Sequence, residues 1–180
     1  MGNQINLESM HARHRALTAA IAAAYREAAC ICLSRHHVSP VLITLSDNGT
    51  GSEAELSWNN PGSRAEGAWA NTDDATEAGA YSCVIAGVEL IRNLFAVRRA
   101  EKGTGADYYI GPIGSGEDDL EDCLRLEISG IDAGTHDEVA KRLRAKIRQA
   151  LSGNSNLPAL AGVIGFSAKF LMLADVPEEM

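Results

Sequence analysis

The sequence contains few aromatic residues and few prolines, and it has no excess of positive charge. It has three Phe, two Trp, four Tyr and five Pro in 180 residues. Sixteen Lys and Arg stand against 24 Asp and Glu, which gives a net charge of −8. A protein that coats nucleic acid usually carries a basic excess, so the surface as a whole is not a nucleic-acid footprint, although a local basic patch is compatible with this balance. The 46% hydrophobic and 22% charged residues are ordinary for a globular domain and exclude a disordered, collagen-like or coiled-coil chain.

Long hydrophobic runs are also missing. No stretch approaches the ~20 uninterrupted apolar residues of a membrane span. The most apolar early stretch, residues 16–33, is mostly alanine and is interrupted by Arg26 and Glu27. Residues 1–8 are polar and lack the basic-then-apolar order of a signal peptide. We therefore expect a soluble, cytoplasmic protein with no membrane partner.

The four cysteines do not form a recognised zinc pattern. Cys30 and Cys32 form a C-x-C pair near His36 and His37, but nothing nearby completes a CxxC…CxxC or CxxC…HxxxH spacing. Free cysteine is among the most buried residue types. We therefore interpret these cysteines as small buried residues rather than metal ligands.

Hydrophobic periodicity predicts helices and strands mixed in a single α/β domain of residues 1–180. The expected elements are a helix at 7–35, a hairpin at 41–58, a loop at 59–74, a helix at 75–101, strands at 106–110 and 123–129, a helix from 136 to about 151, and one or two strands within 159–176. A mixed β-sheet flanked by helices would accommodate this order. Residues 1–74 would supply a long N-terminal helix and a hairpin before a core at 75–180.

Acidic residues occur on two neighbouring predicted strands. Asp107 begins one strand, and Glu127 lies in the next between Leu126 and Ile128. Two such carboxylates can converge on one Mg²⁺, an ion that keeps waters able to attack a phosphodiester. Two alternatives remain open. Asp107 can cap a turn, and Glu127 can face solvent or pair with a cation of the following helix.

The order of elements around these acids resembles the core of the PD-(D/E)XK nuclease superfamily, which runs helix, strand, strand, strand, helix, strand. The resemblance covers about residues 76–175. It implies that Asp107 and Glu127 are the two acids of the motif and that Glu89 is the additional acid often found on the first helix. The chain also resembles uncharacterised bacterial proteins that pair a GTGxDY stretch with an LE(I/V)SG stretch, a likeness that implies no activity.

The chain departs from the superfamily motif at one position. Ser129 stands where the superfamily has a lysine that positions the attacking water and stabilises negative charge. Some members recruit this group from the following helix, so the resemblance implies that Lys141, Lys146 or Arg142 takes the role. Lys141 is our candidate catalytic residue, beside Asp107 and Glu127.

The predicted helix after residue 135 is strongly basic. Its cations, which we predict to bind nucleic acid, are Lys141, Arg142, Arg144, Lys146 and Arg148. The alternative is a solvated helix face with cations placed favourably near its C-terminal end.

Other catalytic motifs are not supported. The Gly103-x-Gly105 and Gly114-x-Gly116 pairs do not follow a strand and open a helix, as a dinucleotide fingerprint would. Ser129, His136 and Asp107 lack the GxSxG elbow of a hydrolase triad.

Two functions are therefore favoured over a third, a small-molecule hydrolase. The first is a protein that binds or cleaves DNA or RNA with Mg²⁺ or Mn²⁺, for which the resemblance suggests a setting in bacterial defence or mobile-element biology. The second is a catalytically inactive, nuclease-like interaction module, bound to a protein partner or to a second copy of itself through its alanine-rich first helix.

Overall fold

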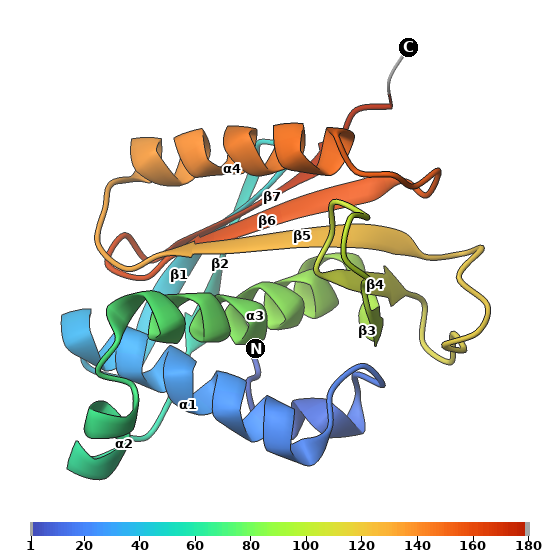
Figure 1. Ribbon diagram of the computed structural model, residues 1–180. Coiled ribbons are helices and arrows are strands. Elements are labelled where there is room, and N and C mark those ends of the chain that lie inside the picture. Colours follow the sequence, from blue (N-terminus) through green and yellow to red (C-terminus); the bar gives the residue numbers. More distant parts are fainter. Residues whose placement is uncertain (1, 179–180) are drawn as a thin grey trace.

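Seven strands form one mixed sheet in the computed structural model, which describes residues 2–178 (Figure 1). The helices are α1 (Ala19–His36), α2 (Ser63–Ala68), α3 (Thr72–Arg92) and α4 (His136–Leu151), with a short 3-10 turn at Met10–Ala12. The strands are β1 (Val41–Asp47), β2 (Thr50–Leu56), β3 (Phe95–Arg99), β4 (Tyr108–Gly111), β5 (Leu124–Ile131), β6 (Ala159–Gly165) and β7 (Phe170–Val176). Their order in the sheet is β2-β1-β7-β6-β5-β4-β3.

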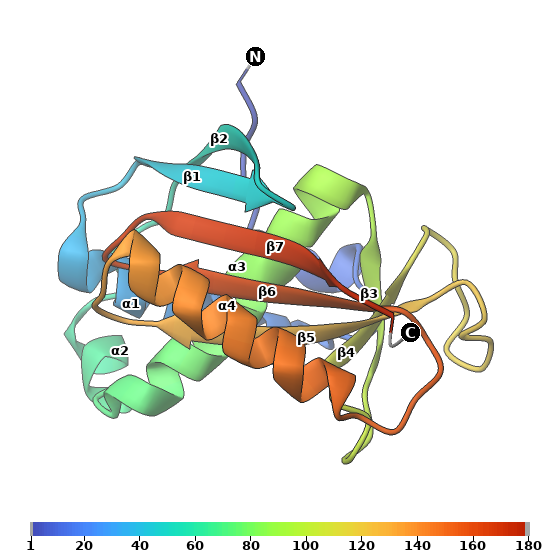
Figure 2. The same cartoon turned by 90° about the horizontal axis from the view of Figure 1, so that it is seen from above.

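Helices cover both faces of the sheet. Helix α4 lies on one face, and α3 lies on the other with α1 packed against its outer side (Figure 1). Seen from above, α4 crosses β5, β6 and β7 (Figure 2). The main core fills the space between the sheet, α3 and α1, and a smaller apolar cluster lies under α4. This arrangement confirms the predicted single α/β domain with a mixed, helix-flanked sheet.

The strand directions define the part of the sheet that matters for the site. Strand β4 runs antiparallel to both of its neighbours, β3 and β5, and β6 runs parallel to β5. Strand β5 pairs with β4 over Leu124–Leu126, whereas it pairs with β6 from Arg125 to Ile131. The second half of β5 therefore extends past the β4 ladder, and its edge faces the space between α3 and α4.

Local signals explain several element boundaries. Thr135 and Glu138 form a capping box at the start of α4, each side chain accepting the other residue's backbone N–H. Asn48 and Gly49 both have positive φ in the turn of the predicted hairpin, as a tight two-residue turn requires.

The predicted helix at 7–35 is wrong over its first half. Helix α1 begins at Ala19, with the Thr18 side chain accepting the N–H of Ile21. The preceding residues bury their apolar side chains without forming an α-helix, and Arg13 and His14 of this segment bind Glu89 of α3.

The predicted helix at 75–101 and the predicted loop at 59–74 also need correction. Helix α3 ends at Arg92 because Asn93 adopts a left-handed conformation, and the next residues form the edge strand β3. The predicted loop contains α2 and the first turn of α3. Within residues 2–178, no helix has the length and apolar character needed to cross a membrane.

Candidate active site

Strand β5 presents Glu127 toward α4. Its neighbours Leu126 and Ile128 are buried in the core on the α3 side, so alternation along the strand places Glu127 on the opposite face. Glu127 is 3% exposed, and Lys146 Nζ of α4 lies 2.7 Å from its Oε1 atom. A buried carboxylate is thus held by one cation of the helix above it.

Asp107 lies directly before β4 and is bound to residues on both sides of Glu127. Its backbone N–H donates to the Leu126 carbonyl oxygen at 2.8 Å. Its side-chain Oδ2 accepts the N–H of Ile128, also at 2.8 Å. These two bonds fix Asp107 beside the second half of β5, where the β4 ladder has ended.

The environment disfavours the charged form of both carboxyl groups. Burial raises the pKa of Asp107, against the opposing effects of its hydrogen bond with Ile128 and of nearby Arg99 and Lys146. Burial also raises the pKa of Glu127, and the charge of Asp107 raises it further, while Lys146 opposes the shift. Two carboxylates that share a desolvated site need a proton or a cation between them, and such pairs are concentrated at functional sites.

A tyrosine and an arginine complete the surroundings of Asp107. The Tyr81 hydroxyl lies 3.2 Å from Asp107 Oδ1 and 3.1 Å from Glu77 Oε1, so its single proton is shared between two carboxylates. The Arg99 guanidinium lies over the rings of Tyr81 and Tyr108, at 4.7 Å from each centroid. Arg99 Nη2 is 3.6 Å from Asp107 Oδ1.

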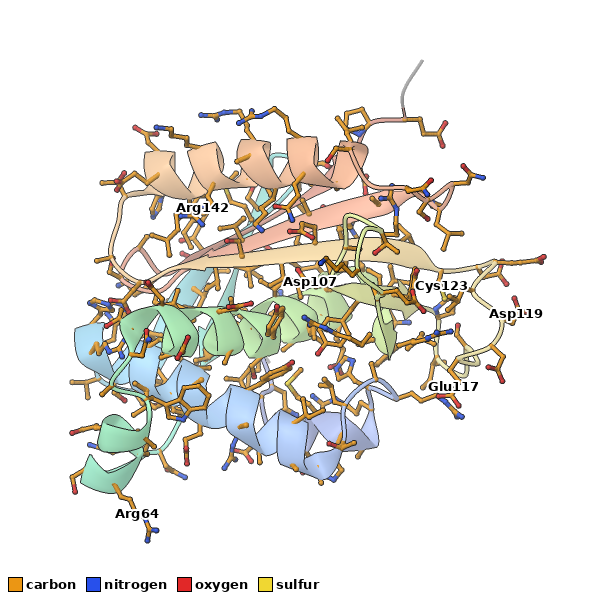
Figure 3. The ribbon with its side chains drawn as sticks, in the orientation of Figure 1. Arg64, Asp107, Glu117, Asp119, Cys123 and Arg142 are labelled. Carbon is orange, nitrogen blue, oxygen red and sulfur yellow. The ribbon has the colours of Figure 1, made fainter. Side chains whose placement is uncertain are left out.

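Asp107, Glu127 and Tyr81 line a cleft of about 710 Å³ between α3 and α4, and Arg99 lies next to Asp107 outside this lining. Its floor is the free edge of β5, and its walls differ in charge. The α3 wall contributes Asp73, Glu77 and Tyr81, whereas the α4 wall contributes Arg142, Lys146 and Gln149. Figure 3 shows Arg142 between α4 and β5, with Asp107 lying between the levels of the two helices.

A buried arginine holds the cleft's supporting loops together. Arg125 is 6% exposed, and its Nη1 donates to the carbonyl oxygens of Thr104 and Ala150 at 2.8 and 3.0 Å. The first carbonyl lies in the turn before Asp107 and the second near the end of α4. Gly105 has φ +67°, and a Cβ there would come within 2.8 Å of Gly153, so this turn needs glycine. Arg125 therefore ties the segment that carries Asp107 to the helix that carries Lys146.

The structure brings together four of the residues that the sequence singled out. Asp107, Glu127, Lys146 and Arg142 line the same cleft, and Arg142 Nη1 lies 3.3 Å from Ser129 Oγ. Glu89 lies elsewhere, twelve residues after Glu77 on α3. It binds Arg13 at 2.7 Å and the buried His14 at 2.8 Å, so the structure does not place it with the other acids.

The predicted basic strip on α4 divides into two faces. Because successive helix residues turn by about 100°, Arg142 and Lys146 share the side that faces the cleft. Lys141, Arg144 and Arg148 are exposed and lie outside the lining of the cleft. The structure therefore brings Lys146, and not Lys141, to Glu127.

The described residues do not form a metal centre with three or more protein ligands. Within residues 2–178, no three His, Cys, Asp or Glu side chains are grouped closely enough to hold a metal ion. The cysteines are buried and free, as predicted. Burial raises the pKa of Cys30 to about 11 and that of Cys32 to about 12, so both remain thiols at neutral pH.

Sequence reasoning missed Tyr81, Glu77 and Gln149, and it placed Arg99 at the end of a helix. Glu77 and Tyr81 are one helical turn apart, which is a weak signal that they share a face. The packing of α3 against the sheet determines which end of the helix approaches Asp107. The strand that carries Arg99 was not predicted, because the expected helix extended through residue 101. A comparison of the chain with protein-family models, curated proteins and solved structures found no match in any of the three.

Proposed function

We propose that this protein binds nucleic acid and hydrolyses its phosphodiester bonds with a divalent cation, using a PD-(D/E)XK-like core. The order α3, β3, β4, β5, α4, β6 supports this proposal, because it supplies a helix, three antiparallel strands, a crossover helix and a parallel strand. Asp107 precedes the second of these strands, and Glu127 lies on the third. The strand β3, which the sequence did not indicate, completes the order.

The observation that carries the proposal is the contact between Lys146 and Glu127. The distance from Nζ to Oε1 is 2.7 Å, and Asp107 lies beside this pair. The two candidate acids and a lysine thus lie together in the cleft, although Ser129 occupies the usual lysine position. In this proposal α4 supplies the missing ammonium group.

The residues present fit a hard divalent cation. Asp107 and Glu127 would hold Mg²⁺ or Mn²⁺, because Mg²⁺ prefers oxygen ligands and is often bound through one or two carboxylates and several waters. Burial is the main reason that the pKa of Glu127 is raised, and the repulsion from Asp107 that adds to it would be relieved by positive charge between the two groups. When bound, such an ion lowers the pKa of a coordinated water and polarises a phosphoryl oxygen.

The remaining groups have roles that follow from their positions. The Lys146 ammonium donates to Glu127 and to Gln149 Oε1 at 3.1 Å, which fixes it at the cleft wall. It would orient the attacking water and stabilise the negative charge that develops on the phosphate. Tyr81 would hold Asp107 in its observed orientation through the bond to Oδ1.

The test is a cleavage assay on single- and double-stranded DNA and RNA with Mg²⁺, Mn²⁺ or EDTA. We expect metal-dependent cleavage by the wild type. Asp107→Asn, Glu127→Gln and Lys146→Met should each reduce it by about 10²–10⁴-fold, the range for loss of a positioned catalytic group. Lys141→Met is the matched comparison, because Lys141 lies on the same helix outside the cleft, and it should retain cleavage near the wild-type rate.

Equal cleavage by wild type and Lys146→Met would contradict the role of Lys146. Folded wild-type protein that cleaves none of the four substrates with either metal would contradict the proposed hydrolysis. That outcome would favour the alternative in which this fold serves as a non-catalytic interaction module.

A further inference from the structure

We propose that the substrate is an extended polynucleotide strand, and that Arg99 and Arg142 hold the phosphates on either side of the one that is cleaved. This inference rests on the proposed function and deepens it by defining the path of the strand. The strand would pass Arg99, cross the Asp107–Glu127 pair and continue past Arg142 along the free edge of β5.

Arg99 is positioned to bind a phosphate at one end of this path. Its guanidinium lies 4.7 Å from the centroids of both Tyr81 and Tyr108, and it donates to the Tyr81 hydroxyl at 3.1 Å. Stacking on aromatic faces restricts an arginine without neutralising it. The contact with Asp107 is long, at 3.6 Å, and the Arg99 side chain remains 48% exposed. A fixed, half-exposed guanidinium is well suited to bidentate binding of phosphate.

Arg142 occupies the other end. Its Nη1 reaches Ser129 Oγ at 3.3 Å, a long contact with a neutral group, and the residue is exposed. Ser129 lies two residues after Glu127 on the same face of β5, which corresponds to about 6.6 Å along the strand. This separation is comparable to that between successive phosphates of an extended nucleic-acid strand. A phosphate at Arg142 would thus be the neighbour of one at Glu127.

The topology places these two arginines on opposite sides of the carboxylates. Arg99 lies on β3 and is paired with Tyr108 of β4, whereas Arg142 descends from α4 onto β5. The walls of the cleft then orient the strand across its width. Asp73 and Glu77 on the α3 wall repel phosphates, so the backbone would follow the α4 wall and the bases would face α3.

The chain provides a matched control for each arginine. Arg98 neighbours Arg99 on β3, has a similarly exposed side chain at 44%, and forms an ion pair with Glu101. Arg144 lies two residues after Arg142 on α4 but outside the cleft lining. Neither control lies on the proposed path, although each carries the same charge as the residue it matches.

The test measures the association constant K for a short, fluorescein-labelled single strand at a series of salt concentrations. DNA and RNA are measured separately, and Ca²⁺ replaces Mg²⁺. For single strands, the slope of log K against log salt is about −0.7 for each phosphate contact. Arg99→Gln and Arg142→Gln should each reduce the magnitude of the slope by about 0.7, and the double variant by about 1.4. Arg98→Gln and Arg144→Gln should leave it at the wild-type value.

Arg99→Lys separates a charge contact from a folding defect. It keeps the charge, so a slope near that of the wild type is expected, and thermal melts establish that all variants are folded. Unchanged slopes for Arg99→Gln and Arg142→Gln, or equal losses in the two controls, would overturn the inference. If the wild type cleaves the substrate but the slopes are unchanged, the proposed strand path is contradicted and the proposed hydrolysis is not. Reduced slopes without cleavage would support the path and count against hydrolysis.

Discussion

Asp107 and Glu127 lie close to each other, and both side chains are largely buried. Glu127 is 3% exposed, and burial is the largest influence on the pKa of both carboxyl groups. Each group is nevertheless hydrogen-bonded, Asp107 to Ile128 and Glu127 to Lys146. Carboxyl groups with perturbed pKa values are concentrated at functional sites, so this pair is the strongest residue-scale support for the proposed function.

The raised pKa values make folding stability depend on pH in a defined direction. A carboxyl group whose pKa is raised by folding binds its proton more tightly in the folded state, so it favours folding less once it ionises. As pH rises from about 4, the ordinary pKa of these groups, toward neutrality, wild-type stability should fall relative to Asp107→Asn/Glu127→Gln. Urea unfolding at several pH values measures this difference.

Two exposed acids provide the control for that experiment. Asp118→Asn/Glu121→Gln removes the same number of carboxyl groups from the exposed loop between β4 and β5. Its stability should follow the wild type across the same pH range. Parallel curves for the wild type and the cleft variant would show that folding does not raise the pKa values of Asp107 and Glu127.

At the scale of elements, close packing of α3 on the sheet sets the position of the cleft's lower wall. A Cβ at Gly162 of β6 would lie 2.4 Å from Val84 Cγ1 and 3.0 Å from Leu173 Cδ2. The same helix lies close to β5, where a Cβ at Gly130 would approach the Thr76 carbonyl oxygen within 2.9 Å. Small residues on the sheet therefore allow α3 to bring Tyr81 and Glu77 to Asp107.

Gly162→Ala should lower the free energy of unfolding by about 1–3 kcal/mol, the usual cost of overpacking a dense core. Gly67→Ala is the control, because Gly67 lies in α2 with no atom within 4 Å of an added Cβ. It should leave stability unchanged or raise it slightly, since alanine favours helix. Chemical denaturation compares the two variants, and an equal effect of both would contradict close packing at β6.

Elements with strong local signals were predicted correctly, and those set by tertiary contacts were not. The capping box of Thr135 and Glu138 and the turn at Asn48 and Gly49 identify α4 and the hairpin from sequence. Helix α3 ends at Asn93, which adopts a left-handed conformation. The sequence around Asn93 is also compatible with a longer helix, so the packing of the folded chain determines where α3 ends. Strand β3 forms because β4 provides an edge to pair with. No local sequence pattern indicates that this edge is available for pairing.

At the scale of the whole molecule, the site is assembled from segments that are distant in the sequence. This limits how many of its residues can be predicted from the sequence. Alternation along one strand was enough to suggest that Glu127 faces away from Leu126 and Ile128. Pairing with a cation of the next helix was one of the open alternatives for Glu127, and the contact with Lys146 confirms it. Glu89 was chosen from the helix pattern alone, whereas the packing of α3 brings Glu77 near Asp107 through Tyr81.

The distribution of charge over the molecule also separates the cleft from its surroundings. The chain has a net charge of −8, yet two cations of α4 face the cleft and three lie outside its lining. An acidic protein gains little general attraction for a polyanion, so recognition of a phosphate chain must depend on local groups. This is why the proposed path is defined by Arg99 and Arg142 rather than by overall charge.

The most direct test is to locate a bound cation by anomalous diffraction at the manganese absorption edge, using crystals soaked in Mn²⁺. The proposal predicts one anomalous peak in contact with the carboxylates of both Asp107 and Glu127, and its loss in crystals of Asp107→Asn/Glu127→Gln. A cleft without a peak in the wild type, or one whose peak persists in the double variant, would contradict the assignment of these two acids as the cation site.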